Sequence, residues 1–218
     1  MKETYFRPDN IGSVVSAMID NIPAEYQRRT PPPVDRAVLL VLDMQRFFLE
    51  PGSHAFIPSA PAILSGLNRL IMAFSKTGRP VIYTRHVNSA ENAGLMGRWW
   101  RDTIGAEGEY SLLCGELNVP PDGPVLRKSQ YDAFHNTELE AILVKNKIDT
   151  VVIGGVMTHL CCETTARSAF MRGFNVTFLA DGTAAYTAAH HRASLLNLAH
   201  GFAHIVTVEA LLAQLEKR

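Results

Sequence analysis

The stretch that decides the fold is TVVIGGVMTHLCCETTAR, residues 150–167. It begins with a short run of β-branched residues, which is typical of a buried strand, and Gly154 and Gly155 end that run. Residues 163–172 then carry apolar side chains at helical spacing, so we predict a helix there. A strand that leads through glycines into a helix places Cys161 at the N-terminal end of that helix.

A thiol at this place is a candidate nucleophile. The positive end of a helix dipole and free backbone N–H groups stabilise a thiolate, so we expect the pKa of Cys161 to fall below its usual value of about 8.5. The alternative is that Cys161 and Cys162 are small buried apolar residues at a strand-to-helix turn. The two cysteines by themselves favour neither interpretation.

The composition of the whole chain limits the classes of function. The 218 residues are 47% hydrophobic and 19% charged, which predicts one domain with a substantial core. Lys and Arg together number 21, as do Asp and Glu, so no strong electrostatic field attracts nucleic acid or an anionic membrane. We therefore expect a small neutral or anionic molecule as the substrate.

The cysteine count and the N-terminus bear on the compartment. Three cysteines are an odd number in a long chain, which does not indicate a disulfide framework and suits a reducing interior. The first ten residues carry charges of both signs, and the apolar stretch at 11–19 is short and interrupted by serines. This pattern indicates neither a signal peptide nor a membrane span. We expect the protein in the cytoplasm, with no membrane or nucleic-acid partner.

Strand and helix patterns alternate along most of the chain. The first thirty-odd residues are polar and end in three prolines at 31–33, so we treat residues 1–33 as an N-terminal arm and residues 34–218 as a single domain. Apolar runs predict strands at 37–42, 80–84, 150–156, 175–180 and 204–206, with a further short apolar segment at 124–126. Helical spacing predicts helices at 61–74, 138–144, 163–172, 187–199 and 208–215. The alternation predicts an α/β fold: a doubly wound, mostly parallel sheet with helices on both faces.

One segment, residues 88–124, interrupts this alternation. It is rich in glycine and contains Trp99 and Trp100. Long irregular segments in compact α/β domains often cap a binding site, so the tryptophans are candidates for its wall. Packing of both tryptophans on the body of the domain or on a second subunit is equally compatible with the sequence.

Three residues that can carry chemistry follow apolar strands. In open α/β sheets the binding pocket lies beyond the carboxyl ends of the strands, and Asp43, Lys128 and Cys161 all fall at such ends. Singly, each has an ordinary explanation, because strand-end carboxylates often cap helices and lysines usually lie in solvent. Together they supply a base, a cation and a nucleophile that can converge on one cleft.

These residues lie within three longer motifs: LLVLDMQRFF around Asp43, RKSQYDAFHNTELE around Lys128 and GGVMTHLCCETTARSAFMRGF around Cys161. From about residue 37 to the last predicted helix, the chain resembles the isochorismatase-like cysteine hydrolases, in which such motifs occur in this order. The resemblance implies a Rossmann-like three-layer fold and a catalytic triad of Asp43, Lys128 and Cys161. It also implies hydrolysis of a small carboxamide, carbamoyl compound or ureide through a cysteine thioester, without a cofactor.

The same resemblance implies an oxyanion hole and an assembly. The backbone N–H groups of Met157 and Cys161 would bind the oxyanion, beside a cis peptide bond between Val156 and Met157. Asp43 would accept the thiol proton while Lys128 holds the carboxylate ionised. Because relatives are commonly dimers or tetramers, we expect a homo-oligomer.

Two branches of the family differ from this chain at a few positions. The true isochorismatases cleave a vinyl ether without a covalent intermediate and carry glycine where this chain has Cys161, so the cysteine favours amide or ureide hydrolysis. The nicotinamidases bind a metal through an acidic residue and histidines after the second strand, where this chain has His86 and Asn88. We therefore expect no catalytic metal and a hydrogen-bonding role for His86. Vinyl-ether hydrolysis and a noncatalytic binding module stay open as alternatives.

The side chains that select the substrate are the least constrained by pattern. We expect apolar walls from aromatic residues and bidentate binding of a substrate carboxylate by arginine. The candidates are Phe48, Trp99, Tyr131 and Phe134 for the walls and Arg85, Arg98 and Arg101 for the carboxylate. For each arginine, a solvated surface charge is the ordinary alternative.

Overall fold

At the centre of the molecule lies a sheet of six strands, all parallel. The computed structural model describes residues 2–27 and 30–216, and within them the strand order is β3-β2-β1-β4-β5-β6. The strands are β1 (Ala37–Leu42), β2 (Val81–His86), β3 (Val125–Lys128), β4 (Thr150–Val156), β5 (Asn175–Ala184) and β6 (His204–Val206). Every strand predicted from the sequence is present, which confirms the doubly wound α/β fold.

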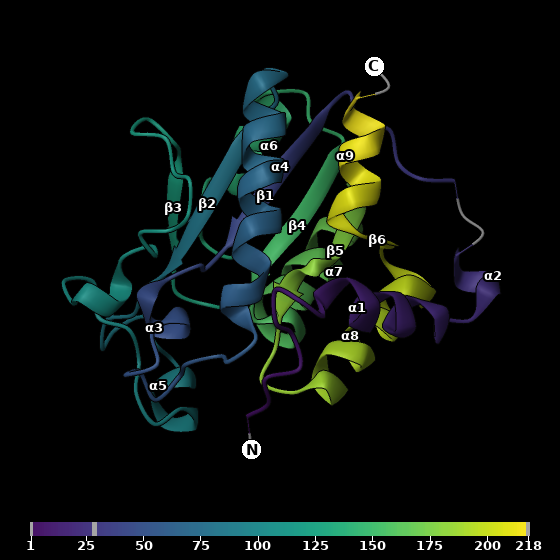
Figure 1. Ribbon diagram of the computed structural model, residues 1–218. Coiled ribbons are helices and arrows are strands. Elements are labelled where there is room, and N and C mark those ends of the chain that lie inside the picture. Colours follow the sequence, from purple (N-terminus) through teal and green to yellow (C-terminus); the bar gives the residue numbers. More distant parts are fainter. Residues whose placement is uncertain (1, 28–29, 217–218) are drawn as a thin grey trace.

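Helices cover both faces of this sheet (Figure 1). In the described residues the α-helices are α1 (Ile11–Asp20), α2 (Ala24–Gln27), α3 (Arg46–Leu49), α4 (Leu64–Lys76), α5 (Met96–Trp99), α6 (Leu139–Lys145), α7 (Glu163–Met171), α8 (Ala188–Gly201) and α9 (Val208–Glu216). α4 and α9 pack against each other in front of the sheet, and α6 and α7 lie behind it. The five predicted helices are among these nine, and none of the nine is long and apolar enough to cross a bilayer.

β1 and β4 form the buried centre of the sheet because their residues are apolar on both faces. Every residue of both strands is buried, and the strands pair in register from Ala37 with Thr150 to Leu42 with Gly155. Gly155 is required at the end of β4. Its φ of +110° is one that other residues rarely adopt, and a Cβ there would lie 2.1 Å from the backbone oxygen of Leu42. The glycine therefore lets the two central strands approach closely at the carboxyl edge.

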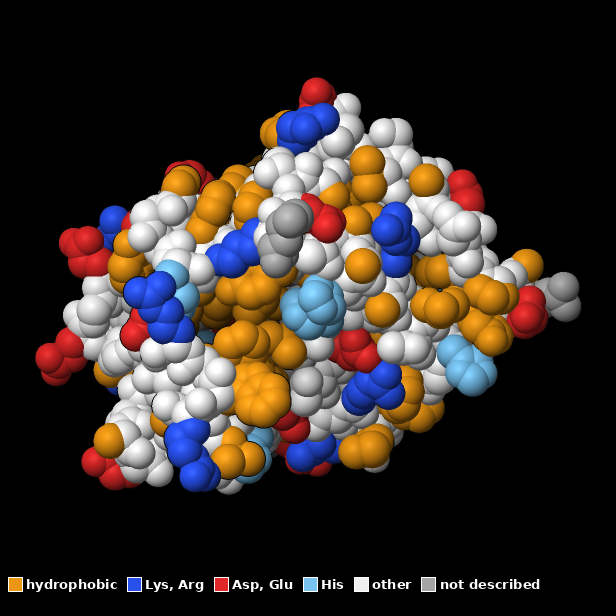
Figure 2. Space-filling model, turned by 90° about the horizontal axis from the view of Figure 1, so that it is seen from below, with side chains coloured by type: hydrophobic (Ala, Val, Ile, Leu, Met, Phe, Trp, Pro, Cys, Tyr) orange, Lys and Arg blue, Asp and Glu red, His pale blue; other side chains and the backbone are white. Residues whose placement is uncertain are grey.

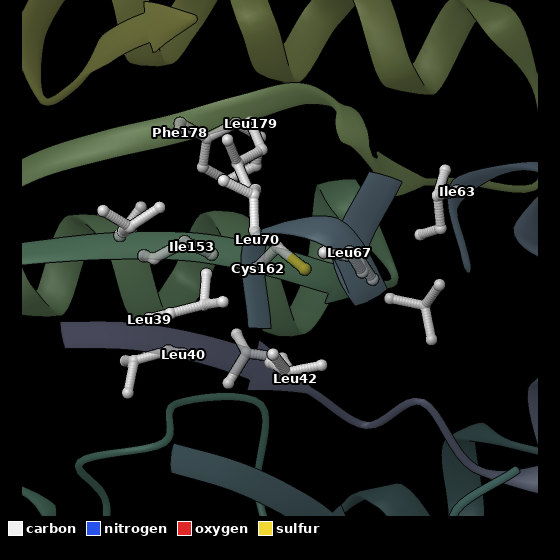
Figure 3. Packing of buried hydrophobic residues seen from close by; sticks show 14 of the residues in the cluster. Leu39, Leu40, Leu42, Ile63, Leu67, Leu70, Ile153, Cys162, Phe178 and Leu179 are labelled. Carbon is white, nitrogen blue, oxygen red and sulfur yellow. The ribbon is translucent and has the colours of Figure 1, made fainter. Parts of the chain in front are cut away.

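The side chains between the sheet and α4 form part of one apolar core (Figure 3). Leucines from β1 and α4 lie near Phe178 and Leu179 of β5 in this close-up. Cys162 lies among them and is fully buried. For Cys162, the structure therefore supports the interpretation as a small apolar residue of the core.

The N-terminal segment packs against the domain and does not extend away from it. α1 contacts β5, and Phe6, Val15 and Met18 are buried in the core. The backbone N–H of Glu3 donates to the carbonyl oxygen of Tyr186 at 2.8 Å. The polar composition of this segment suggested an appendage, but a few apolar side chains at helical spacing are enough to bury one face of α1. The domain boundary at residue 33 stays a prediction.

The first part of the irregular segment 88–124 lies at the carboxyl edge of the sheet, together with α3 and α5, and its last residues run back to the start of β3 (Figure 1). They contain α5 and one turn of 3-10 helix at Glu109–Ser111. An antiparallel bridge joins Gln45, which directly precedes α3, to Leu113. This segment therefore borders the place where the strands end.

Candidate active site

The strand order of the sheet changes direction between β1 and β4. The order runs from β1 to β2 and β3 on one side and from β4 to β5 and β6 on the other. In doubly wound sheets, ligands bind beyond the carboxyl ends of the strands at such a switch point. Asp43 directly follows β1, Lys128 is the last residue of β3, and Cys161 lies in the turn after β4. The topology therefore brings three distant segments to one place.

The three side chains are in contact. The ammonium nitrogen of Lys128 lies 2.7 Å from Asp43 Oδ2 and 3.4 Å from Cys161 Sγ. All three residues are buried: Asp43 is 0%, Lys128 3% and Cys161 5% exposed. The peptide bond between Val156 and Met157, which leads to the cysteine, is cis. The convergence that the strand-end positions predict is therefore present.

Asp43 is held in a backbone conformation that is unfavourable for most residues. Its φ is +52°, in the left-handed region, which costs a residue with a side chain free energy. Thr84, a buried residue of β2, forms two hydrogen bonds with Asp43. The Asp43 N–H donates to Thr84 Oγ1 at 3.1 Å, and the Thr84 hydroxyl donates to Asp43 Oδ1 at 2.6 Å. The carboxylate is therefore oriented with Oδ2 toward Lys128 before any ligand binds.

The ammonium of Lys128 has more acceptors than hydrogens. Besides Asp43 and Cys161, it lies 3.0 Å from the carbonyl oxygen of Gln130 and 3.3 Å from Nδ1 of His86. An ammonium carries three hydrogens. The two shorter contacts, to Asp43 and Gln130, leave one hydrogen that His86 and Cys161 share. As negative charge develops on the sulfur, this hydrogen can turn fully to Sγ.

Asp43 and Lys128 keep each other ionised. Burial is the largest single influence on Asp43 and raises its pKa, but Lys128, His86 and Cys161 together hold the pKa below its ordinary value. Burial is also the largest influence on Lys128 and lowers its pKa, but Asp43 and Cys161 together raise the pKa above its ordinary value. The pair is therefore charged at neutral pH although it is out of contact with bulk water.

The thiol of Cys161 does not have the lowered pKa that the sequence suggested. It lies in a π-helical turn, Thr158–Cys162, that precedes α7. Burial raises the pKa of the thiol to about 12, Lys128 lowers it, and Asp43 raises it. The predicted lowering was wrong for the resting state because burial and the neighbouring carboxylate outweigh the favourable charges. The resting site holds a neutral thiol beside a carboxylate.

The turn that carries Cys161 is anchored from behind by His191. Nε2 of this buried histidine lies 2.9 Å from the carbonyl oxygen of Ala180, and Nδ1 lies 3.1 Å from Thr158 Oγ1. Because a carbonyl oxygen can only accept, Nε2 carries the hydrogen and Nδ1 accepts from the Thr158 hydroxyl. The turn of Cys161 is thereby tied to β5.

His86 and Asn88 form a hydrogen-bonded pair beside the triad. The side-chain amide of Asn88 donates to the carbonyl oxygen of Ser129 at 2.9 Å, so its Oδ1 faces Nε2 of His86 at 2.9 Å. Nε2 therefore carries the hydrogen, and Nδ1 presents its lone pair to Lys128. Burial, and then the charge of Lys128, lowers the pKa of His86 to about 4, so the ring is neutral at pH 7. The predicted hydrogen-bonding role of His86 is confirmed.

Asp43, His86 and Cys161 are also a group whose donor atoms could surround a metal ion, since one atom from each lies within 4.8 Å of the others. The Lys128 ammonium, however, already contacts all three, at 2.7, 3.3 and 3.4 Å. A divalent cation at this place would lie against a positive charge in a buried site. The arrangement therefore does not fit a metal ion while Lys128 is charged.

A cavity of about 260 Å³ opens beside the triad, and Cys161 and His86 form part of its wall. Most of the remaining wall is aromatic or apolar, including Phe47, Phe48, Trp100, Tyr131, Leu160 and Tyr186. Figure 2 views the molecule from the side on which α3 and α5 lie in Figure 1. Hydrophobic side chains surround a hollow there, and basic side chains lie at its edge. A small molecule in the cavity can therefore contact the sulfur.

The structure brings two of the four predicted wall residues to the cavity. Phe48 and Tyr131 line it. Trp99 is 79% exposed, and its neighbour Trp100 lines the cavity in its place. The indole N–H of Trp100 donates to the Tyr131 hydroxyl at 2.7 Å. Phe134 is buried in the apolar core and does not line the cavity.

The three predicted arginines also differ in whether they line the cavity. Arg101 lines the cavity, whereas Arg98 is exposed outside it. Arg85 is bound by Ser111, whose carbonyl oxygen accepts from Nε at 2.7 Å and whose hydroxyl lies 2.6 Å from Nη2. A carboxylate would have to displace Ser111 to reach this guanidinium.

Sequence reasoning missed Lys2, His54 and Phe47, which also line the cavity. Phe47 stands next to the predicted Phe48 in the first motif, so the motif itself could have indicated it. Lys2 and His54 lie in segments without strand or helix pattern, and no signal in the sequence points to them.

Comparisons with known proteins agree with this geometry. The isochorismatase domain family matches residues 37–210, a stretch that contains Asp43, Lys128 and Cys161. Nicotinamidase 3 from Arabidopsis thaliana is 36% identical over 192 residues, which span 86% of this chain and 93% of that protein. The isochorismatase of Bacillus subtilis (strain 168) is 29% identical over 187 residues. They span 85% of this chain but 60% of that protein, which is less than two thirds of this relative.

Solved structures share the fold over most of their length. A cysteine hydrolase from Pseudomonas syringae pv. phaseolicola 1448A superposes with a TM-score of 0.82 at 27% identity, covering 87% of this chain and 96% of that one. The pyrazinamidase of Pyrococcus horikoshii, solved in complex with zinc, has a TM-score of 0.72 at 25% identity and covers 79% of this chain and 99% of that one.

Proposed function

The chain belongs to the isochorismatase family of hydrolases, and from this premise we propose that it cleaves the C–N bond of a small carboxamide, carbamoyl compound or ureide through a thioester on Cys161. One observation carries the proposal. A single ammonium, that of Lys128, contacts both the carboxylate of Asp43 and the sulfur of Cys161, and Cys161 lines a cavity. A base, a nucleophile and a balancing charge are thus within reach of one substrate carbonyl.

In the first step Asp43 takes the thiol proton while the sulfur attacks the carbonyl carbon. The pKa of Cys161 is about 12 and that of Asp43 is lowered, so a free thiolate is strongly disfavoured in the resting site. Proton transfer and attack must therefore be coupled. Lys128 contacts both groups and stabilises the negative charge as it passes from the carboxylate to the sulfur and on to the substrate oxygen.

The attack leaves a tetrahedral intermediate with a negative oxygen. We assign its stabilisation to the backbone N–H groups of Met157 and Cys161, since both residues line the cavity at the end of β4. When the intermediate collapses, the C–N bond breaks, and the nitrogen takes the proton held by Asp43. Ammonia or an amine leaves, and the acyl group stays on the sulfur.

Water completes the reaction. Asp43, ionised again, takes one proton from a water molecule as its oxygen attacks the thioester carbon. The C–S bond then breaks, the sulfur recovers its proton from Asp43, and the acid product leaves. One carboxylate thus acts twice as a base and twice as an acid.

Vinyl-ether hydrolysis of isochorismate is the second candidate, because the Bacillus subtilis isochorismatase is 29% identical to this chain. That reaction needs Asp43 to donate a proton to carbon. The charge of Lys128 lowers the pKa of Asp43, which favours the base over the acid. The electrostatics therefore support the thioester route over the vinyl-ether route.

The test combines turnover with isolation of the acyl-enzyme. Small carboxamides, carbamoyl compounds, ureides and isochorismate are offered to the wild-type protein and to Cys161→Ser and Cys161→Gly. We expect hydrolysis by the wild type, loss of hydrolysis in both variants, and an acyl adduct on Cys161 in acid-quenched samples analysed by mass spectrometry. Isochorismate cleavage that survives Cys161→Gly would assign the protein to the vinyl-ether reaction. Binding without turnover of any compound would support a noncatalytic module.

The proposal includes an assembly and a compartment. We expect a homo-oligomer, a dimer or tetramer, acting on its substrate in the cytoplasm. Trp99 and Leu95, which are 79% and 73% exposed, are apolar residues that a second subunit could cover. Sedimentation velocity of the wild type and of Trp99→Ser tests this part, and a monomeric wild type would contradict it.

A further inference from the structure

Two cations that line the cavity, Lys2 and Arg101, lie outside the triad. The N-terminal segment places Lys2 in the wall of the same cavity that contains Cys161. We propose that Lys2 binds a carboxylate of the substrate, so that the molecule hydrolysed is an amide, carbamoyl compound or ureide that also carries a carboxylate. The reaction at Cys161 is taken from the proposed function, but binding of the carboxylate does not require turnover.

The charges near Lys2 leave it without a counterion. The carboxylate of Asp102 lies 3.3 Å from Nδ1 of His54 and 3.8 Å from Nε of Arg101. The Lys2 ammonium instead donates to the carbonyl oxygen of His54, and it lies 4.4 Å from the centre of the Tyr186 ring. Neither group carries a negative charge. Across residues 2–27 and 30–216, none of the ion pairs involves Lys2.

The backbone next to Lys2 is fixed. The backbone N–H of Ala188 donates to the carboxylate of Glu3 at 2.9 Å. The hydroxyl of Ser59 donates to the carbonyl oxygen of Glu3 at 3.1 Å and accepts from the N–H of Phe6 at 3.1 Å. The exposed side chain of Lys2 therefore extends from an anchored segment, and its ammonium already donates to the carbonyl oxygen of His54, so less freedom is lost when an anion binds.

The wall between the polar groups directs the orientation of a ligand. Phe48, Trp100 and Tyr186 offer mostly apolar surface, which cannot replace the hydration of an anion. Burial already lowers the pKa of Lys2, so an arriving anion restores a favourable environment for the ammonium. A carboxylate therefore binds best at Lys2, while the apolar part of the molecule lies along the aromatic wall and its C–N group reaches Cys161.

The test uses pairs of probes that differ only in the carboxylate: terephthalamate with benzamide, and succinamate with butyramide. Binding to the Cys161→Ser protein, which cannot form the thioester, is measured by calorimetry at low ionic strength. We expect the carboxylate member of at least one pair to bind roughly tenfold more tightly or better. This preference should disappear in Cys161→Ser with Lys2→Met, persist with Lys2→Arg, and persist with the surface control Lys145→Met.

Three results would overturn the inference. The first is the absence of a carboxylate preference in every pair. The second is an equal loss of affinity for both members of a pair in Lys2→Met. The third is a loss of the preference in Arg101→Met but not in Lys2→Met. The outcome is separate from that of the proposed function. A protein that binds carboxylates through Lys2 but never forms an acyl adduct refutes only the hydrolysis, and one that hydrolyses neutral amides without the preference refutes only the role of Lys2.

Discussion

The floor and the rim of the cavity are built differently. The floor, which we define as Asp43, Lys128 and Cys161, is buried at the ends of strands of one sheet, and of these three residues Cys161 alone lines the cavity itself. The rim, defined here as Lys2, His54, Trp100, Arg101 and Asp102, comes from the N-terminal segment and the irregular connections, and the Arg101 side chain is 80% exposed. The difference suggests that the sheet fixes the chemistry and the peripheral segments select the substrate. Substitutions in the floor should then affect kcat and folding, and those in the rim should affect KM.

The largest effect is expected from Asp43→Asn, which removes the base from the floor. We expect kcat to fall about 10³-fold, within the range attributed to a positioned general base. At the same time the thiol loses the carboxylate that raises its pKa and keeps Lys128, so the pKa of Cys161 should fall below about 12. Ammonia release measures the first effect, and the ultraviolet absorbance of the thiolate against pH measures the second.

Asp102→Asn is the matched control, because it makes the same change in the rim. It should leave both kcat and the thiol pKa unchanged. Cys161→Ser supplies the absorbance background of the other two cysteines. A thiol pKa that rises in Asp43→Asn would show that the carboxylate does not act on the sulfur as described.

The floor could be predicted from the sequence, whereas in the rim the sequence indicated Arg101 but not most of the other residues. Asp43, Lys128 and Cys161 each follow an apolar strand, and the topology of a doubly wound sheet brings strand ends together whatever the loops do. The ionisation of Asp43 beside Lys128 was predicted correctly, whereas that of Cys161 was not. The pKa of Cys161 depends on the balance between burial and two charges of opposite sign, and that balance requires the coordinates.

In the rim, the sequence pattern does not show which of two neighbouring residues lines the cavity. Trp99 and Trp100 are adjacent at the end of a four-residue helix, too short to show which side faces the body, and the structure exposes the first and places the second, half-buried, in the wall. Lys2 contacts the cavity because Phe6 and α1 pack on the core, a long-range effect that the polar composition of the segment concealed.

Lys128→Met should destabilise the fold strongly because it leaves a buried carboxylate without its cation. We expect the free energy of unfolding to fall by about 3 to 5 kcal/mol. Urea unfolding checks this. Asp43→Asn combined with Lys128→Met should recover part of the loss, since no charge is then left unpaired. Lys145→Met, at an exposed position, should change stability by less than about 0.5 kcal/mol. Equal losses in the single and the double variant would contradict the ion-pair explanation.

His191 links the N-terminal segment to the turn that carries Cys161, and it should make the stability of the fold depend on pH. Its Nδ1 lies 3.1 Å from the hydroxyl of Tyr5 in the N-terminal segment and 3.1 Å from the hydroxyl of Thr158. Burial lowers its pKa from 6.5 to about 3. Between these values the unfolded chain binds a proton that the folded chain does not, so stability falls as pH drops below about 6.5, by up to about 1.4 kcal/mol per pH unit.

The measurement is urea unfolding from pH 7 to pH 5 for the wild type and for His191→Asn. The variant should be less stable at pH 7. Its stability should depend less steeply on pH, because the contribution of His191 to the slope is missing. His135→Asn, at an exposed histidine, should keep the wild-type slope. A slope that His191→Asn leaves unchanged would mean that the ring is not the group that resists protonation.

The smallest effect is expected from Tyr131→Phe, at a residue that lines the cavity and contacts Trp100 of the rim. The substitution removes the acceptor of the Trp100 indole N–H, a contact of 2.7 Å, and keeps the aromatic wall. A hydrogen bond of this kind contributes about 0.5 to 1.5 kcal/mol, so KM should rise roughly two- to tenfold while kcat stays the same. Trp99→Phe is the control and should alter neither constant, because its ring is mostly in solvent. If Tyr131→Phe lowered kcat at constant KM, the tyrosine would act on the chemistry of the floor, and the separation between the two regions would fail at the residue that lies between them.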